Sequence, residues 1–237
     1  TKVAKDYKDA KFIGLDIGEG DLGGAEVPEN VFCAVYAEEI PGFFAGYAAV
    51  KEGYKHVGFL GGMAVPAVIR FGYGFVQGAN AAAVDMNIAD DVTVEYVYGG
   101  QFYGDQTITA TMDGWYKNRG VEAVFACGGG IWTSACEAAA KVGGKVIGVD
   151  TDQSALINNY GDGMCVTSAM KGLGATVNAV LASIQAGEWE KYAGKVQSLG
   201  LVSGSDLSVN YVGLPTDSWT MTNFTIDDYK ALVSNVF

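Results

Sequence analysis

Two neighbouring segments of the chain end in side chains that could hold a small polar molecule. The apolar run Val146–Val149 ends in Asp150 and Asp152, and about twenty residues later the run Met164–Thr167 leads to Lys171. Continuous apolar runs of this length, separated by turn-forming residues, are typical of buried parallel strands. In open α/β sheets, ligands bind beyond the carboxyl ends of such strands. The pattern therefore predicts a carboxylate and an ammonium group facing one crevice, which suits a polyhydroxylated ligand.

Three short patterns that occur in enzymes lack the residues that would make them work. Gly18–Gly23 matches G-x-G-x-x-G after a strand, but it holds two acids that would repel a pyrophosphate, and Pro28 follows instead of a clear helix. Ser168–Lys171 matches S-x-x-K without the partner motifs S-D-N and K-T-G. His56 is the single histidine and has no Ser or Cys partner in its sequence context, which argues against a triad or a histidine-rich metal site. We therefore expect a binding protein and not an enzyme, with neither cofactor nor metal.

The composition is that of an acidic globular protein. Hydrophobic residues make up 49% of the 237 residues, and the net charge is −12 with no cluster of basic residues, which argues against a nucleic-acid partner. No apolar run reaches the length of a membrane span, and the first residues show neither a signal peptide nor a lipobox. The four cysteines lack C-x-x-C spacing, and we interpret them as reduced core residues.

The elements that must position these side chains alternate between strand and helix patterns. Strands are predicted at Phe12–Asp16, Val31–Tyr36, His56–Leu60, Val92–Tyr98, Val121–Ala126 and Lys145–Val149, with short candidates near Val196–Leu201 and Ser208–Gly213. Helices are predicted at Phe43–Gly53, Pro66–Met86, Asp105–Asn118 and Trp132–Val142, from Lys171 to about Ala186, and from Ile226 onward. Such alternation predicts βαβ units and an α/β fold with parallel sheets.

Several segments in a fixed order resemble a known family. They are FFAGYAAV (Phe43–Val50), VGFLGGMAVPAVIRFGYGFVQGA (Val57–Ala79), YGGQFYGD (Tyr98–Asp105), VFACGGG (Val124–Gly130), IGVDTDQSA (Ile147–Ala155) and TSAMKG (Thr167–Gly172). In these segments the chain resembles the basic membrane protein family of solute-binding lipoproteins, the PnrA-like nucleoside-binding components of ABC transporters. The resemblance extends from about Lys11 to Gly200.

The resemblance implies a type I periplasmic-binding-protein fold, with two doubly wound parallel-sheet lobes joined by three crossovers around a ligand cleft. Residues 1–63 and about 172–195 are expected to form lobe 1, residues 64–171 to form lobe 2, and residues 196–237 to be a tail shared between the hinge and the lobes. Family members begin with a strand and a turn that carries a ligand-stacking aromatic residue, whereas this chain starts at what resembles a later part of lobe 1. We therefore expect the first lobe to be incomplete.

Asp150 and Lys171 are the candidates for holding the sugar of a nucleoside. Asp150 could accept two hydrogen bonds from the vicinal hydroxyls of a ribose, each contributing roughly 1.5–3 kcal/mol. The alternative is that Asp150 or Asp152 only caps the segment that follows; we assign the ligand contact to Asp150 and the supporting role to Asp152. Lys171 would complement the hydroxyls and balance Asp150, and its alternative is a solvated lysine in the first turn of a helix.

Further candidates concern the nucleobase. Phe102, on a glycine-rich turn, is suited to stack on a base, and its alternative is a loop aromatic folded back onto the sheet. Asp16 matches the family position that hydrogen-bonds the base, which would favour bases with N–H donors such as guanine or hypoxanthine. Gly128, Gly129 and Gly130 let the backbone approach a ligand closely, or only form the βα turn. Trp132 stands where the family usually has a small residue, and whether it walls or closes the pocket is left open.

Together these features imply the substrate-binding component of an ABC transporter, which captures a nucleoside, with purines favoured, and delivers it to a membrane permease. The resemblance implies a monomer outside the cytoplasm, at the cell surface or in the periplasm, anchored by an N-terminal lipid that this chain does not carry. Two alternatives share the architecture. One is a binding protein for a sugar or an autoinducer, and the other is the effector-binding core of a LacI-type regulator, which would need an upstream helix-turn-helix.

Overall fold

Two sheets organise residues 2–237, the part of the chain that the computed structural model describes. The small sheet has the strand order β1-β2-β8, all parallel, with β1 at Phe12–Leu15, β2 at Val31–Tyr36 and β8 at Lys195–Leu199. The large sheet has the order β4-β3-β5-β6-β7-β9 and is parallel except for the β7–β9 pair. Its strands are β3 (His56–Gly61), β4 (Thr93–Tyr98), β5 (Ala123–Cys127), β6 (Lys145–Asp150), β7 (Cys165–Lys171) and β9 (Val212–Gly213).

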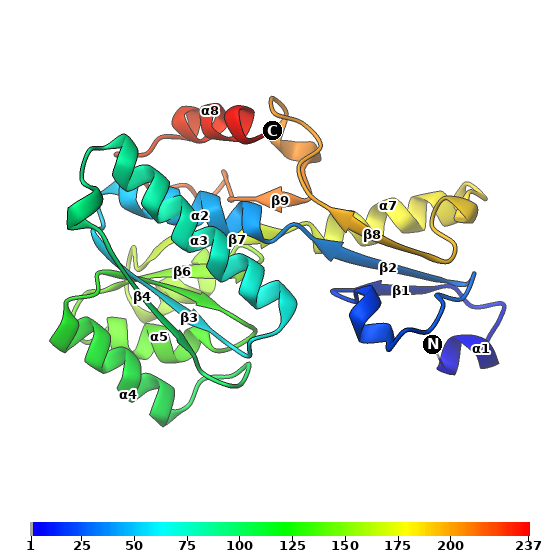
Figure 1. Cartoon of the computed structure of the whole chain (residues 1–237), viewed down its shortest axis with the longest axis horizontal. Coiled ribbons are helices and arrows are strands. Elements are labelled where there is room, and N and C mark those ends of the chain that lie inside the picture. The colour runs from blue at the N-terminus through cyan, green and yellow to red at the C-terminus, as the bar shows by residue number, and fades with distance from the viewer. Residues whose placement is uncertain (1) are drawn as a thin grey trace.

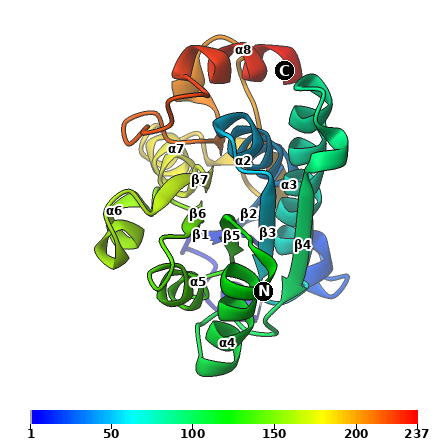
Figure 2. The ribbon, with the colours of Figure 1, turned by 90° about the vertical axis from the view of Figure 1, so that its left-hand side faces the viewer.

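Helices cover both faces of the large sheet, and α7 packs on the small sheet (Figure 1). The helices are α1 (Lys2–Asp6), α2 (Glu39–Glu52), α3 (Pro66–Asp85), α4 (Gln106–Gly114), α5 (Trp132–Ala139), α6 (Ser154–Ile157), α7 (Leu173–Gln185) and α8 (Ile226–Val236). Figure 2 shows α2 and α3 on one face of the large sheet and α4 and α5 on the other. This arrangement places the carboxyl ends of β5, β6 and β7 toward the small sheet.

The predicted strands and helices are found, with shifted ends. The helix predicted from Phe43 begins at Glu39, and the one predicted to end at Asn118 is α-helical to Gly114 and continues as a π-helical turn. In the strand candidate near 208–213 only two residues pair, and they run antiparallel to β7. All four cysteines are free and buried, which confirms their interpretation as core residues.

The expected division of the chain after residue 63 differs from the strand pairing. β3, placed in lobe 1 by that division, pairs with β4 and β5 in the large sheet, and β8, placed in the shared tail, pairs with β2 in the small sheet. The reason is that the chain passes between the sheets directly after β2, at Ala37–Glu38, so that α2 already packs against the large sheet. By strand pairing, the change of sheet therefore comes before α2.

Three connections run between the two sheets, and backbone hydrogen bonds tie them together. They are residues 37–38 between β2 and α2, residue 172 between β7 and α7, and residues 200–211 between β8 and β9. The Ala37 N–H donates to the Leu199 carbonyl at 2.9 Å, and the Gly172 N–H donates to the Tyr211 carbonyl at 2.7 Å. Movement of the two sheets about these three connections would leave both sheets folded.

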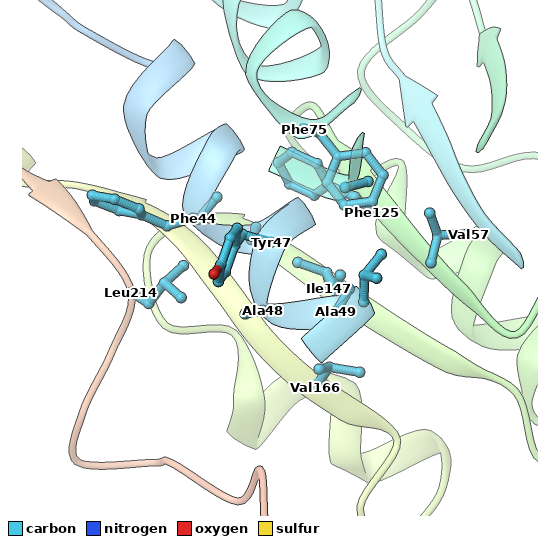
Figure 3. Close-up of a cluster of buried hydrophobic side chains, with 14 of the residues drawn as sticks. Phe44, Tyr47, Ala48, Ala49, Val57, Phe75, Phe125, Ile147, Val166 and Leu214 are labelled. Atoms are coloured by element: carbon cyan, nitrogen blue, oxygen red, sulfur yellow. The ribbon is translucent and has the colours of Figure 1, made fainter. Parts of the chain in front are cut away.

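The main core lies between the large sheet and the pair α2 and α3. Figure 3 shows Phe44 and Tyr47 of α2 and Phe75 of α3 with strand residues such as Phe125 and Ile147, and each of these side chains is buried. Large aromatic and small alanine residues of α2 together fill the space above the sheet. Burying apolar side chains of this size is the main stabilising term of such a core.

The close approach of α2 and α3 depends on glycines at spacings of four residues. A Cβ atom on Gly42 or Gly46 of α2 would overlap a backbone carbonyl of α3, and one on Gly74 or Gly78 of α3 would overlap a backbone carbonyl of α2. Residues four apart lie on one face of a helix. The two helices therefore touch backbone to backbone, and this contact holds the start of α3 beside the hinge.

We expect Gly78→Ala to destabilise the protein by about 2 kcal/mol, because the new methyl group would push into the Phe43 carbonyl and overpacking costs about 1–3 kcal/mol. The matched control is Gly174→Ala in α7, where a Cβ would meet no atom within 4 Å. That variant should gain up to about 1 kcal/mol, since alanine favours helix more than glycine. Urea denaturation of both variants checks this, and equal effects of the same sign would contradict the close-contact explanation.

Candidate functional site

A cavity of about 750 Å³ lies between the small sheet and the carboxyl ends of the large sheet. Its wall is formed by the segment after β1, the end of β2, the first turns of α3, the turn that carries Phe102, and the tips of β5, β6 and β7. This volume falls in the range of small-molecule sites. The charged side chains of the wall are Asp16, Asp21, Glu38, Asp150, Arg70 and Lys171.

Three of the predicted site residues meet at one point of this cavity. The Lys171 ammonium nitrogen lies 2.6 Å from Asp16 Oδ2 and 3.1 Å from Asp150 Oδ1. Asp150 and Lys171 come from the adjoining tips of β6 and β7, as expected, whereas Asp16 follows β1 of the small sheet. The lysine therefore bridges the two sheets across the cavity. Its side chain is 3% exposed, while those of Asp16 and Asp150 are 42% and 35% exposed.

Burial and charge pairing act against each other in this cluster. Burial alone would lower the pKa of Lys171, but the carboxylates of Asp150 and Asp16 outweigh it and raise that pKa above its usual value. Burial raises the pKa of Asp150, against the opposing effect of the Lys171 ammonium. Lys171 Nζ also lies 5.7 Å from the centre of the Tyr36 ring and 5.8 Å from that of Phe71. Aromatic faces at this distance help to hold a cation out of water.

Asp16 and Asp150 share an unusual backbone conformation. Their φ angles are 57° and 67°, in the left-handed region that residues other than glycine rarely adopt. Each aspartate comes at the end of a strand, and the left-handed turn redirects the chain there. Residues in this region cost free energy, and they cluster at ligand sites where the surrounding structure holds them. The shared conformation supports a common role for the two carboxylates at the mouth of the cavity.

The residues after Asp150 form a support for the tip of β6. Asp152 Oδ1 accepts a hydrogen bond from the Ser154 N–H at 3.0 Å, which confirms its expected role in capping the following segment. The side chain of Gln153 folds back, and its Oε1 accepts from the Val149 N–H at 2.9 Å. The Gln153 N–H in turn donates to the buried Ser168 hydroxyl at 3.1 Å. This network fixes the loop that presents Asp150.

Phe102 lines the cavity as predicted, and its ring rests on glycines. A Cβ on Gly62 would lie 2.5 Å from Phe102 Cδ1, and one on Gly128 would lie 3.0 Å from the same atom. Gly128 and Gly129 line the cavity, but Gly130 is not part of its wall and instead donates its N–H to the Phe102 carbonyl at 2.7 Å. These glycines therefore make room for the aromatic ring as well as for the cavity.

Two charged wall residues that were not predicted from the sequence form an ion pair. Arg70, in α3, directs its Nε to Glu38 Oε2 at 2.6 Å, and the Glu38 side chain is fully buried. Burial raises the pKa of Glu38, against the lowering effect of Arg70. A signal for Glu38 was present, since it lies two residues beyond the end of β2, and the other acids of the site also stand at or just beyond the end of a strand. Trp132 packs edge-on against Tyr160 outside the cavity wall.

The wall of the cavity offers carboxylates, two cations and an aromatic face. The burial of Cys127 raises the pKa of its thiol well above the usual value, so that this residue of the wall is held as an unreactive thiol. In residues 2–237 no group of three or more histidine, cysteine, aspartate or glutamate side chains is placed to hold a metal ion. Within that range no helix has both the length and the apolar content needed to cross a membrane.

Comparison with known proteins agrees with the expected family and fold. The family described as ABC transporter substrate-binding protein PnrA-like matches residues 1–210. Basic membrane protein B of Borreliella burgdorferi is 31% identical over 196 residues, covering 80% of this chain and 52% of that protein. ABC transporter nucleoside-binding protein BmpA of Lactococcus lactis is 34% identical over 140 residues, covering 54% of this chain and 37% of that protein. The chain spans about half the length of the curated relatives it matches.

A solved structure shows the same fold over nearly the whole chain. The crystal structure of a solute-binding protein of an ABC transporter system from Aeropyrum pernix superimposes with a TM-score of 0.70 at 21% identity, covering 99% of this chain and 65% of that one. At this identity the likeness is one of fold. It confirms the prediction of an α/β fold of the type I periplasmic-binding-protein kind.

Proposed function

Because the chain belongs to the family of PnrA-like substrate-binding proteins of ABC transporters, we propose that it captures a nucleoside in the cavity between its two sheets. The single observation that carries this proposal is the meeting of Asp16, Asp150 and Lys171 at the cavity. Carboxylates and an ammonium group at one point complement vicinal hydroxyls, which both donate and accept hydrogen bonds. The printed name of the Lactococcus lactis relative, a nucleoside-binding protein, points to the same ligand class.

In this proposal the ribose lies at the tips of β6 and β7. Asp150 accepts hydrogen bonds from the vicinal hydroxyls, and Lys171 donates to a ribose oxygen. Asp16, which comes from the small sheet and lies 2.6 Å from the same ammonium group, accepts from an N–H of the base, which favours hypoxanthine and guanine. Gly128 and Gly129 line the cavity without side chains and leave room for the ligand at the tip of β5.

Phe102 stacks on the base in this arrangement, and we expect Phe102→Ala to weaken nucleoside binding about tenfold to a hundredfold. The reason is that stacking a base on an aromatic ring contributes roughly 1–3 kcal/mol. The matched control is Tyr103→Ala, since Tyr103 is the exposed neighbouring aromatic and is not part of the cavity wall. Isothermal titration calorimetry measures both; equal weakening by the two substitutions would show that Phe102 acts through the loop and not by stacking.

Delivery follows from movement of the two sheets about the three connections that join them. A ligand that contacts Asp16 of the small sheet together with Asp150 and Lys171 of the large sheet would favour a closed form. We propose that a membrane permease recognises this closed form, and that the protein acts outside the cytoplasm, anchored by an N-terminal lipid. We also propose that it binds its ligand as a monomer.

A ligand panel tests the proposal. Thermal unfolding of the full-length protein should shift upward with inosine, guanosine or adenosine, because a ligand that binds only the folded state stabilises it by mass action. The panel also contains three sugars, ribose, xylose and galactose, which test the sugar-binding alternative. Stabilisation by a sugar with no response to any nucleoside would overturn the nucleoside assignment and favour the sugar-binding alternative.

A further inference from the structure

Arg70 lines the cavity and carries hydrogen-bond donors that no residue in the described part of the chain uses. In residues 2–237 its guanidinium makes one hydrogen bond, from Nε to Glu38 Oε2, and both terminal Nη groups remain without a protein acceptor. The side chain is 36% exposed and lines the cavity. An arginine of a cavity wall whose inner nitrogen is fixed, and whose two outer nitrogens have no acceptor among the described residues, is available to donate to a bound molecule.

Glu38 holds this guanidinium in place. The Glu38 carboxyl has no exposed surface, and its Oε1 is buried without a hydrogen-bond partner among the residues described. A buried carboxylate with only one partnered oxygen is costly, and such groups in folded proteins call for an explanation. The residue stands in the connection between β2 and α2, whereas Arg70 belongs to α3. The pair therefore fixes the arginine relative to the hinge.

We propose that Arg70 is a further ligand-binding residue that donates to an uncharged acceptor atom of the bound molecule, with Glu38 as its positioning residue. This inference rests on the proposed function for the identity of the ligand as a nucleoside. The contact adds a donor to a site whose other named side chains, apart from Lys171, accept hydrogen bonds or stack.

The charge of the cavity wall identifies the acceptor as uncharged. Four carboxylates and two cations line the cavity, and Lys171 is already shared between Asp16 and Asp150. Arg70 is likewise paired through Nε with Glu38, and Glu39 Oε2 lies 3.9 Å from the same nitrogen. A phosphate would bring further negative charge to this wall, where both cations, Lys171 and Arg70, are already paired with carboxylates. A carbonyl oxygen, a ring nitrogen or a hydroxyl meets the donors without that repulsion.

Calorimetry of the full-length protein with inosine tests the contact. Arg70→Met should raise the Kd about tenfold to a hundredfold, as expected for losing a charge-assisted hydrogen bond. The matched control is Arg119→Met, because Arg119 also pairs with a glutamate, Glu95, but does not line the cavity. The control should bind inosine within about twofold of the parent. An unchanged Kd in Arg70→Met would overturn the proposal.

Ligand analogues separate a direct contact from an effect on the fold. Purine riboside, 7-deazainosine, 3-deazainosine, and 5′-, 2′- and 3′-deoxyinosine each lack one acceptor of inosine. The loss caused by Arg70→Met should vanish for the analogue that lacks the contacted atom, and an equal loss for all six would overturn the proposal. Inosine 5′-monophosphate should bind the parent more weakly than inosine. Tighter, Arg70-dependent binding of the monophosphate would show a phosphate site and overturn the uncharged acceptor.

Glu38 is tested by rescue. Glu38→Gln retains an oxygen that can accept from Arg70 Nε, whereas Glu38→Leu does not. The leucine variant should therefore reproduce the analogue pattern of Arg70→Met, and the glutamine variant should keep most of the parent's discrimination. Equal weakening for every analogue in both variants would show that Glu38 supports only the fold, which would overturn its positioning role.

The failure of this inference and that of the nucleoside proposal can be told apart. If the parent binds a sugar and no nucleoside, the nucleoside assignment fails. The Kd values of Arg70→Met and Arg119→Met are then compared for that sugar. A selective loss in Arg70→Met with the sugar still supports the arginine contact. A parent that binds inosine, with Arg70→Met equal to it, rejects the arginine contact and leaves the nucleoside proposal standing. A parent that binds neither class overturns both.

Discussion

Replacing Asp150 with alanine is expected to weaken nucleoside binding severely while leaving the fold in place. Two charge-assisted hydrogen bonds to the ribose would be lost, each contributing about 1.5–3 kcal/mol, so the Kd should rise by about 10² to 10⁴. The fold should persist because Asp150 lies at the tip of β6, with its side chain 35% exposed, outside the apolar core. Calorimetry measures the affinity, and circular dichroism measures the fold.

The matched control for this variant is Asp152→Ala. Asp152 accepts a hydrogen bond from the Ser154 N–H and is not part of the wall of the 750 Å³ cavity. Its replacement should cost about 0.5–2 kcal/mol of stability, as expected for a lost cap, with little change in affinity. If Asp150→Ala binds normally and only loses stability, as the control does, then Asp150 is a cap and the ribose site is misplaced.

Lys171→Met is expected to weaken both binding and stability. With the ammonium gone, the carboxylates that lie 2.6 and 3.1 Å from it face one another without a cation. Breaking a buried ion pair costs about 3–5 kcal/mol, and exposure of both carboxylates reduces this to roughly 2 kcal/mol of unfolding free energy. Affinity for inosine should fall by about a hundredfold or more. The site loses the ammonium group that donates to the ribose, and it keeps two carboxylates that repel each other.

The pH dependence of stability distinguishes this cause from a packing defect. Burial raises the pKa of Asp150, and without the opposing ammonium of Lys171 its ionised form destabilises the fold. That loss is present at neutral pH and is relieved as the pH falls and the Asp150 carboxylate is protonated. The stability of Lys171→Met should therefore approach that of the parent in acid, whereas a packing defect would persist at every pH. Lys141→Met, which removes an exposed partner of Asp113, should change stability little.

The fold was largely predictable because its signals are local. Apolar runs such as Val31–Tyr36 and Lys145–Val149 are long enough to identify buried strands, and Pro66 marks the first turn of α3. The assignment of strands to sheets was less accessible, because β3 follows β2 in sequence but belongs to the other sheet. Pairing depends on where the chain crosses between sheets, and no local pattern marks that crossing at Ala37–Glu38.

The candidate site was predictable only where the rule of strand tips applies. That rule located Asp150 and Lys171, the glycine-rich turn pointed to Phe102, and the family resemblance added Asp16; all four line the cavity. It did not reveal that Lys171 would reach Asp16, since the two residues are 155 positions apart and belong to different elements.

Arg70 was missed because nothing in a helical pattern shows which face of α3 meets the cavity. That face is set by the close contact of α2 and α3, in which glycines of each helix lie against backbone carbonyls of the other. This contact belongs to tertiary packing and could not be read from the sequence. The same packing places the guanidinium within reach of Glu38.

The most direct test compares inosine with 2′,3′-dideoxyinosine, which lacks the vicinal hydroxyls, in calorimetric titrations of the full-length protein. The account predicts clear binding of inosine and a loss of about a hundredfold or more in affinity for the dideoxy compound, with the two ligands equal in Asp150→Ala. Equal affinity of the parent protein for both compounds would contradict the assignment of Asp150 and Lys171 to the ribose.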